Sequence, residues 1–165
     1  MKSEKTIEIL KTAILLERKG KAFYSHVASQ ANDSDVKEFF QMMADEEDEH
    51  VKFLTEQYEN FTKNESFSKV EFKHEDHADD DILTQKVKQK IESASFESAA
   101  ISSAIDMENR AIKVYSDRAE TAETKEERDF YNWLANWERG HNKLLHEIDK
   151  ALQDKVWNDN SFWPF

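Results

Sequence analysis

Two stretches of the sequence, 91 residues apart, repeat one pattern and decide the fold. They read Phe40-x-x-Met43-x-x-x-Glu47-x-x-His50-x-x-x-Leu54 and Tyr131-x-x-Leu134-x-x-x-Glu138-x-x-His141-x-x-x-Leu145. Offsets of three and four residues lie on one face of an α-helix, so a Glu and a His share the apolar face in both stretches. Each stretch therefore predicts an amphipathic helix with two ionisable side chains in the middle of its buried face.

Two further stretches place a single carboxylate inside an apolar face, at Glu17 and at Glu108. Their neighbours at helical spacing are Leu10, Ala13, Ile14 and Tyr24 around Glu17, and Ile101, Ala104, Ile105, Ile112 and Tyr115 around Glu108. A shift of 91 residues lays 17–54 on 108–145 without a gap, and 11 of these 38 positions are identical. An internal duplication of this kind predicts a helical bundle with pseudo-two-fold symmetry.

An apolar period of 3.6 residues marks four long segments, about 4–31, 34–62, 94–122 and 125–154. The first two and the last two are joined by short connections, which predicts two antiparallel hairpins. Thr124 and Glu127 have the spacing of a helix capping box. The polar stretch 63–93, with a short helix expected at 82–92, is long enough to cross the bundle. We predict an all-α four-helix bundle over 1–155.

An aromatic tail follows at 156–165, where Trp157, Phe162, Trp163 and Phe165 gather. Exposed aromatic side chains at this density would be sticky. We expect the tail to dock on the bundle or on a second subunit, and the alternative is a free binding motif.

The composition excludes several classes of protein. Two Gly and one Pro in 165 residues are too few for a β-rich fold, a P-loop or a dinucleotide-binding loop. A net charge of −12 opposes binding to nucleic acid or to anionic membranes. No apolar run approaches the roughly 20 residues of a membrane span, and the absence of Cys excludes thiolate metal sites within this chain. We expect a soluble cytoplasmic protein.

Four inward carboxylates need compensating cations, because burying each one alone would cost several kcal/mol or raise its pKa. No Lys or Arg shares these faces at the same level, so two divalent metal ions are the expected partners. The alternative is a polar core of paired, partly protonated carboxylates. Glu71 and His74 repeat the Glu-x-x-His spacing in the crossover without apolar neighbours, and we interpret them as part of a solvated acidic segment, the alternative being a surface metal site.

The sequence resembles the rubrerythrin family of ferritin-like proteins. The resemblance covers the four helices and rests on 13–17 with Phe23-Tyr24, on 44–50, on 104–108 with Val114-Tyr115, and on 138–141. It implies two iron ions per chain, with Mn or Zn as other possibilities, and reduction of hydrogen peroxide or oxidation of ferrous iron. It also implies a homodimer or larger assembly. The implied metal ligands and catalytic residues are Glu17, Glu47, His50, Glu108, Glu138 and His141.

Two features depart from the family pattern. Full-length members carry a Cys-ligated rubredoxin domain, which this chain lacks, so a rubredoxin-like protein or another external reductant would supply electrons. Family members also have a Glu one turn after the third-helix ligand, where this chain has Ala111 opposite Gly20. We expect an open pocket there that admits water or a small oxidant, and the alternative is that a bulky side chain such as Trp137 fills the space. The alternatives are an iron-storage protein with a ferroxidase entry site and a bundle that metal merely stabilises.

Three other side-chain positions have alternative interpretations. Tyr24 and Tyr115 could hydrogen-bond the ligating carboxylates or simply fill the core. Glu46 could orient His141, although its repeat equivalent, Trp137, can only donate a hydrogen bond. We expect Trp133 and Trp137 to serve in packing or at an interface.

Overall fold

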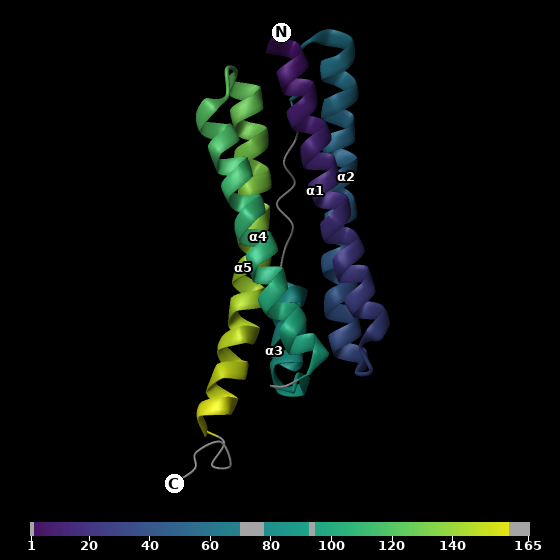
Figure 1. The fold of residues 1–165 in the computed structure, drawn as a ribbon, viewed down its shortest axis with the longest axis vertical. Helices are drawn as coiled ribbons and strands as arrows, with labels where there is room; N and C mark the ends of the chain where they lie inside the picture. Colours follow the sequence, from purple (N-terminus) through teal and green to yellow (C-terminus); the bar gives the residue numbers. More distant parts are fainter. Residues whose placement is uncertain (1, 70–77, 93–94, 159–165) are drawn as a thin grey trace.

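The computed structural model describes residues 2–69, 78–92 and 95–158, and these residues form helices without any β-strand (Figure 1). The helices are α1 (Lys2–Gln30), α2 (Ser34–Asn64), α3 (Ala78–Lys90), α4 (Phe96–Thr121) and α5 (Lys125–Asn158). The predicted all-α class is confirmed. The four long helices match the four predicted segments, and the short helix expected in the crossover corresponds to α3, which begins four residues earlier than predicted.

Both hairpins have short connections with capped helix starts. Asp33 precedes α2, and its carboxylate accepts hydrogen bonds from the backbone N–H groups of Asp35 and Val36. At the second hairpin, the Thr124 hydroxyl accepts from the Glu127 N–H at 3.2 Å. The Glu127 carboxylate accepts from the N–H of Glu123 at 3.1 Å, one residue before the position that a capping box predicts. These bonds satisfy amides that a helix start leaves without partners.

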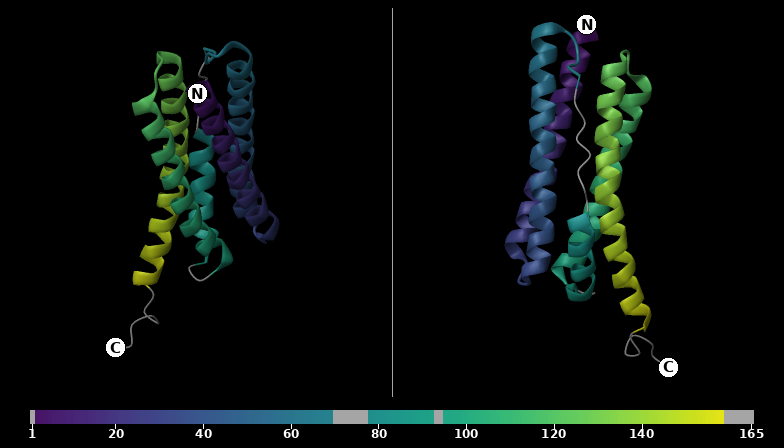
Figure 2. Two further views of the ribbon diagram at one scale, coloured as in Figure 1. Left: turned by 45° about the horizontal axis from the view of Figure 1, so that its top comes forward. Right: turned by 180° about the vertical axis from the view of Figure 1, so that it is seen from behind.

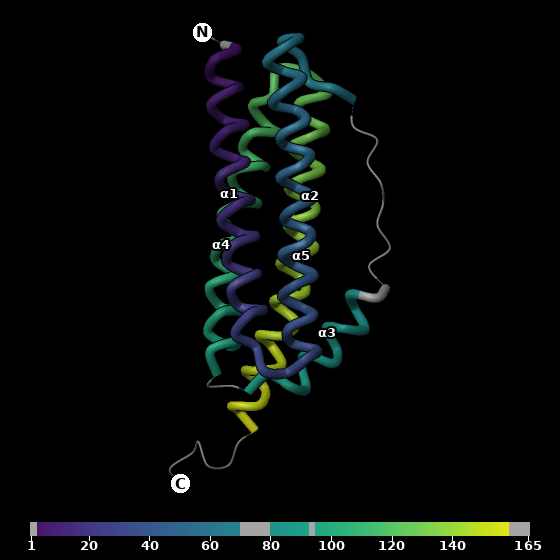
Figure 3. The backbone as a smooth tube through the Cα atoms, turned by 90° about the vertical axis from the view of Figure 1, so that its right-hand side faces the viewer, coloured from purple at the N-terminus to yellow at the C-terminus, as the bar shows by residue number. Residues whose placement is uncertain are grey.

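The hairpins lie side by side with a long crossover between them. Helix α2 ends near the N-terminus of the chain, whereas α4 begins at the opposite end of the bundle, so the two helices run parallel (Figures 1 and 2). The side view in Figure 3 shows α3 beside α2 and α5 in the half of the bundle farther from the N-terminus, and α3 packs on both helices. Within the described residues, no helix is long and apolar enough to cross a membrane.

Two apolar clusters fill the bundle on either side of a polar middle layer. One is built from buried residues of all five helices, including Phe39, Phe40 and Leu145. The other lies toward the N-terminal end of α1 and includes Leu10, Leu54 and Phe130. Fully burying side chains of this size contributes about 1.5–3 kcal/mol each. The clusters therefore hold the helices together above and below the ionisable residues between them.

Two sequence-based expectations fall largely outside the described residues. In the aromatic tail, Trp157 is 65% exposed at the end of α5, and Phe162, Trp163 and Phe165 lie outside the described residues. Glu71 and His74 of the acidic crossover also lie outside them.

Candidate metal centre

The four long helices each contribute to one buried polar cluster at mid-height of the bundle. The structure brings together all six residues singled out from the sequence, and none is more than 3% exposed. Their ligand atoms form two overlapping groups in which all atoms lie within 4.8 Å of one another. The groups are Glu17, Glu47, His50 and Glu138, and Glu47, Glu108, Glu138 and His141. Glu47 and Glu138 belong to both groups, so each carboxylate would help to hold either of two ions.

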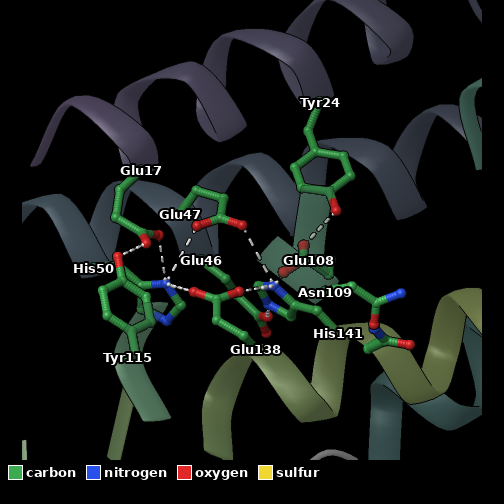
Figure 4. Close-up of polar contacts among 11 residues, drawn as sticks. Glu17, Tyr24, Glu46, Glu47, His50, Glu108, Asn109, Tyr115, Glu138 and His141 are labelled. Atoms are coloured by element: carbon green, nitrogen blue, oxygen red, sulfur yellow. Dashed lines mark hydrogen bonds and ion pairs between the residues drawn. The ribbon is translucent and has the colours of Figure 1, made fainter. Parts of the chain in front are cut away.

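Both histidines direct Nδ1 into the cluster (Figure 4). His50 Nδ1 lies 3.1 Å from Glu17 Oε2, 3.2 Å from Glu47 Oε2 and 2.9 Å from Glu138 Oε1. His141 Nδ1 lies 3.5 Å from Glu47 Oε1, 3.4 Å from Glu108 Oε1 and 3.3 Å from Glu138 Oε2. Each imidazole therefore faces three carboxylates, one terminal and two shared.

The crowding of carboxylates moves their pKa values in opposite directions. Burial and the neighbouring Glu47 raise the pKa of Glu17 to about 7. Burial would also raise the pKa of Glu47, but its close contacts with Glu17 and with the two histidines outweigh burial and lower the pKa to about 2. Burial and the three surrounding carboxylates raise the pKa of Glu138 well above its usual range. The metal-free cluster therefore holds protons at neutral pH.

The pKa values of the two histidines are shifted in the direction opposite to that of ordinary buried imidazoles. Burial favours the neutral ring, but the nearby carboxylates outweigh it and raise the pKa of His50 and of His141 well above the usual value. Glu138 makes the largest contribution for His50, and Glu108 for His141. In the metal-free protein, the protonated imidazole rings therefore supply positive charge next to the carboxylates.

Several buried nitrogen and oxygen atoms of the cluster have no hydrogen-bond partner. They are His50 Nε2, Glu108 Oε2, His141 Nδ1 and both carboxylate oxygens of Glu138. Leaving buried polar atoms unsatisfied costs about 1–3 kcal/mol each, and more for charged groups. All of these atoms belong to side chains of the two groups, although His50 faces the carboxylates with Nδ1 and not with Nε2. Oxygen and imidazole ligands suit divalent Fe, Mn and Zn alike. The residues present therefore fit a pair of divalent transition-metal ions.

Comparison with known proteins agrees with this geometry. The family model of rubrerythrin matches residues 8–148, which include all six residues of the cluster. The chain belongs to the rubrerythrin family. Membership of the rubrerythrin family implies a di-iron carboxylate protein. Comparisons with curated proteins and with solved structures give no significant match.

Two tyrosines hold the terminal carboxylates of this rubrerythrin-family centre. The Tyr24 hydroxyl of α1 donates to Glu108 Oε1 of α4 at 2.5 Å, and the Tyr115 hydroxyl of α4 donates to Glu17 Oε1 of α1. Burial and the adjacent carboxylates raise the pKa of both hydroxyls well above the usual value, so both stay protonated as donors. Of the two roles left open by the sequence, the structure shows the hydrogen-bonding one.

Glu46 and Trp137 each contact one of the two histidines. Glu46 Oε2 contacts His141 Nε2, which is the orienting contact that the sequence left open. The Trp137 ring meets the His50 ring edge to face, with centroids 5.1 Å apart and planes at 88°. Trp133 packs in turn on Trp137 at 5.4 Å. Glu46 and Trp137 also line a surface groove of about 630 Å³ over α2. The groove is therefore lined by one residue that contacts His141 and by one that contacts His50.

The space beside Gly20 is not the open pocket expected from the sequence. A Cβ atom at Gly20 would lie 3.4 Å from Cδ and 3.5 Å from Oε1 of Glu47. The shared carboxylate therefore rests against the bare backbone of α1, and Ala111 on α4 is buried at 5% exposure. Spacing along one helix does not show this contact, because Glu47 reaches Gly20 from a different helix.

Proposed function

We propose that this rubrerythrin-family protein is a di-iron oxidoreductase that reduces hydrogen peroxide, oxidises ferrous iron, or both. The observation that supports the proposal is the pair of overlapping ligand groups that share Glu47 and Glu138. One group adds Glu17 and His50, and the other adds Glu108 and His141. Two bound ferrous ions would supply the two electrons that, with two protons, convert one peroxide molecule to two of water.

Residues around the ligands would hold the ligand side chains in place and keep water away from the metal site. Tyr24 and Tyr115 fix the terminal carboxylates through hydrogen bonds from the opposite hairpin. The apolar clusters on either side exclude water from the layer, which strengthens electrostatic interactions within it. The two shared carboxylates, Glu47 and Glu138, would help to hold both ions.

The electrons for repeated turnover come from outside this chain in our proposal. The chain contains no Cys, so it cannot hold the thiolate iron centre of a rubredoxin domain. A rubredoxin-like protein or another reductant would then restore the ferrous state. We also propose that the protein acts as a homodimer or larger assembly.

The test is a stoichiometric titration of the metal-loaded protein. Metal-free protein is loaded anaerobically with ferrous iron, and elemental analysis is expected to show two ions per chain. Peroxide and O₂ are then added in separate experiments while ferric absorbance is recorded. We expect one peroxide per chain to complete the oxidation. Failure to bind iron would refute the proposal, and accumulation of ferric iron far beyond two ions per chain would indicate storage instead.

A further inference from the structure

The two halves of the centre follow the internal repeat closely. The shift of 91 residues exchanges Glu17 with Glu108, Glu47 with Glu138, and His50 with His141. It also exchanges the hydrogen bond from Tyr24 to Glu108 with the one from Tyr115 to Glu17. In side-chain type, the two ligand sets are therefore identical, and any difference between the two positions has to come from their surroundings.

One pair of equivalent residues breaks the symmetry next to the imidazoles. Glu46 and Trp137 occupy the same position of the repeat, and each reaches the histidine of the other hairpin. Glu46 gives His141 Nε2 a carboxylate partner, whereas Trp137 gives His50 the edge-to-face contact of an aromatic ring. His50 Nε2 is buried without a hydrogen-bond partner.

The inner nitrogens differ in the complementary way. His50 Nδ1 is hydrogen-bonded to carboxylate oxygens of Glu17 and Glu47. His141 Nδ1 has no hydrogen bond, although it lies within 3.5 Å of three carboxylates. Its outer nitrogen, Nε2, contacts the Glu46 carboxylate. The hydrogen-bonded nitrogen of His141 thus lies on the outer side of the ring, whereas that of His50 faces the ligand groups.

The chemistry of these contacts favours one metal position. A carboxylate that accepts the Nε2 proton fixes the tautomer of a ligating imidazole and makes its Nδ1 a stronger donor. An indole N–H can only donate, so Trp137 cannot accept a proton from His50. Loss of such an outer contact typically weakens metal affinity by about 10–100-fold. The difference between the two positions is expected to lie in this range.

We propose that the two metal positions are inequivalent, that the position containing His141 binds a divalent cation first, and that Glu46 is the positioning residue that sets this order. The proposal rests on the proposed metal centre but concerns a property that the ligands themselves do not determine. The position containing His50 then becomes the one where an ion is held more loosely and exchanges more readily.

The test uses zinc as a diamagnetic probe and observes each histidine separately. The metal-free protein, labelled with ¹⁵N, receives one and then two equivalents of Zn²⁺, and imidazole nitrogen resonances are recorded by NMR. Resonances of His50 and His141 are assigned from His50→Gln and His141→Gln variants. We expect the first equivalent to shift His141 Nδ1 and the second to shift His50 Nδ1. Equal partial shifts of both rings after one equivalent would overturn the proposal.

The Glu46→Gln variant tests whether Glu46 acts by positioning His141 or only by supporting the fold. It keeps the size of the side chain but removes the charge, so the affinity of the first site is expected to fall about tenfold and both histidines to fill together. Glu49→Gln is the matched control, because Glu49 lies in the same groove and pairs with Lys52 at 2.6 Å. It should preserve the order, as should Trp137→Phe. A Glu46→Gln protein that still fills His141 first would refute the role of Glu46.

The outcomes also separate this inference from the proposed function. Binding of two Zn²⁺ with equal filling of both rings leaves the di-metal centre intact and refutes only the inequivalence. Absence of any shift at His50 and His141 after two equivalents refutes both.

Discussion

Replacing Glu138 by Leu should make the metal-free protein more stable while abolishing its metal site. Neither carboxylate oxygen of Glu138 has a hydrogen bond, and the side chain is buried among three other carboxylates. Burial and the neighbouring carboxylates raise the pKa of Glu138 well above its usual range, so at neutral pH the metal-free protein holds a buried carboxyl group without a hydrogen-bond partner. Leu has a similar size and removes this unsatisfied polar group.

The expected gain follows from what the substitution removes. Replacing buried ionic groups by apolar side chains of similar volume is often neutral or stabilising by about 1–4 kcal/mol. For a domain of this length, each kcal/mol raises the melting temperature by about 2–4 °C. Metal binding should be lost at both positions, because Glu138 belongs to both ligand groups.

Glu108→Leu is the matched comparison, and it should behave differently. Glu108 accepts the hydrogen bond from Tyr24 at 2.5 Å, so its removal leaves a buried hydroxyl without its acceptor. An unsatisfied buried donor costs about 1–3 kcal/mol, which offsets most of the gain from removing a charge. The metal-free Glu108→Leu protein should therefore be less stable than the metal-free Glu138→Leu protein.

The assay is urea unfolding of chelator-treated proteins at neutral pH, followed by circular dichroism. Parent, Glu138→Leu and Glu108→Leu proteins are compared by their free energies of unfolding, and iron content is measured after anaerobic loading. A Glu138→Leu protein less stable than the metal-free parent would refute the reasoning. Equal stabilities of the two variants would show that Tyr24 does not distinguish the carboxylates.

Four further predictions concern the centre and the helices that form it. Metal removal should lower the melting temperature, since an ion at 100 times its Kd stabilises a protein by about 2.7 kcal/mol; an unchanged melting temperature on chelation would contradict this. Gly140→Ala should stabilise α5 by about 1 kcal/mol, because nothing lies within 4 Å of the new Cβ. Gly20→Leu should instead displace Glu47 and weaken metal binding, measured by calorimetry. Metal affinity should rise as the pH increases through neutrality and above it, because ions compete with protons on His50 and His141, whose pKa values lie well above the usual value of an imidazole; titrations at several pH values test this.

The bundle could be predicted from the sequence because its apolar period is long and regular. The segment predicted at 94–122 is α4, Phe96–Thr121, and the segment predicted at 125–154 is α5, which continues to Asn158. The boundaries of α3 were predicted less well. Its residues are mostly polar, so the apolar period that marks the other helices is weak there.

The six residues of the centre could also be singled out from the sequence, because a carboxylate in an apolar face is conspicuous. Contacts between the two hairpins could not be predicted from the sequence. The approach of Glu47 to Gly20 and the contact of Glu46 with His141 depend on how helices from different parts of the chain meet. Spacing along one helix gives the direction of a side chain but not the identity of its neighbour on the next helix.

The arrangement of the ligand groups explains why metal and fold should be coupled. Helix α1 packs mainly on α2, and α4 mainly on α5, so the polar layer lies where the two hairpins meet. The group around His50 takes three residues from the first hairpin and Glu138 from the second, and the group around His141 takes Glu47 from the first and three from the second. Each ion would therefore tie the hairpins together, through the same carboxylates that repel one another when no cation is bound. The residues that would hold the metals thus lower the stability of the metal-free bundle. For this reason Glu138→Leu is expected to raise the stability of the metal-free protein and to abolish metal binding.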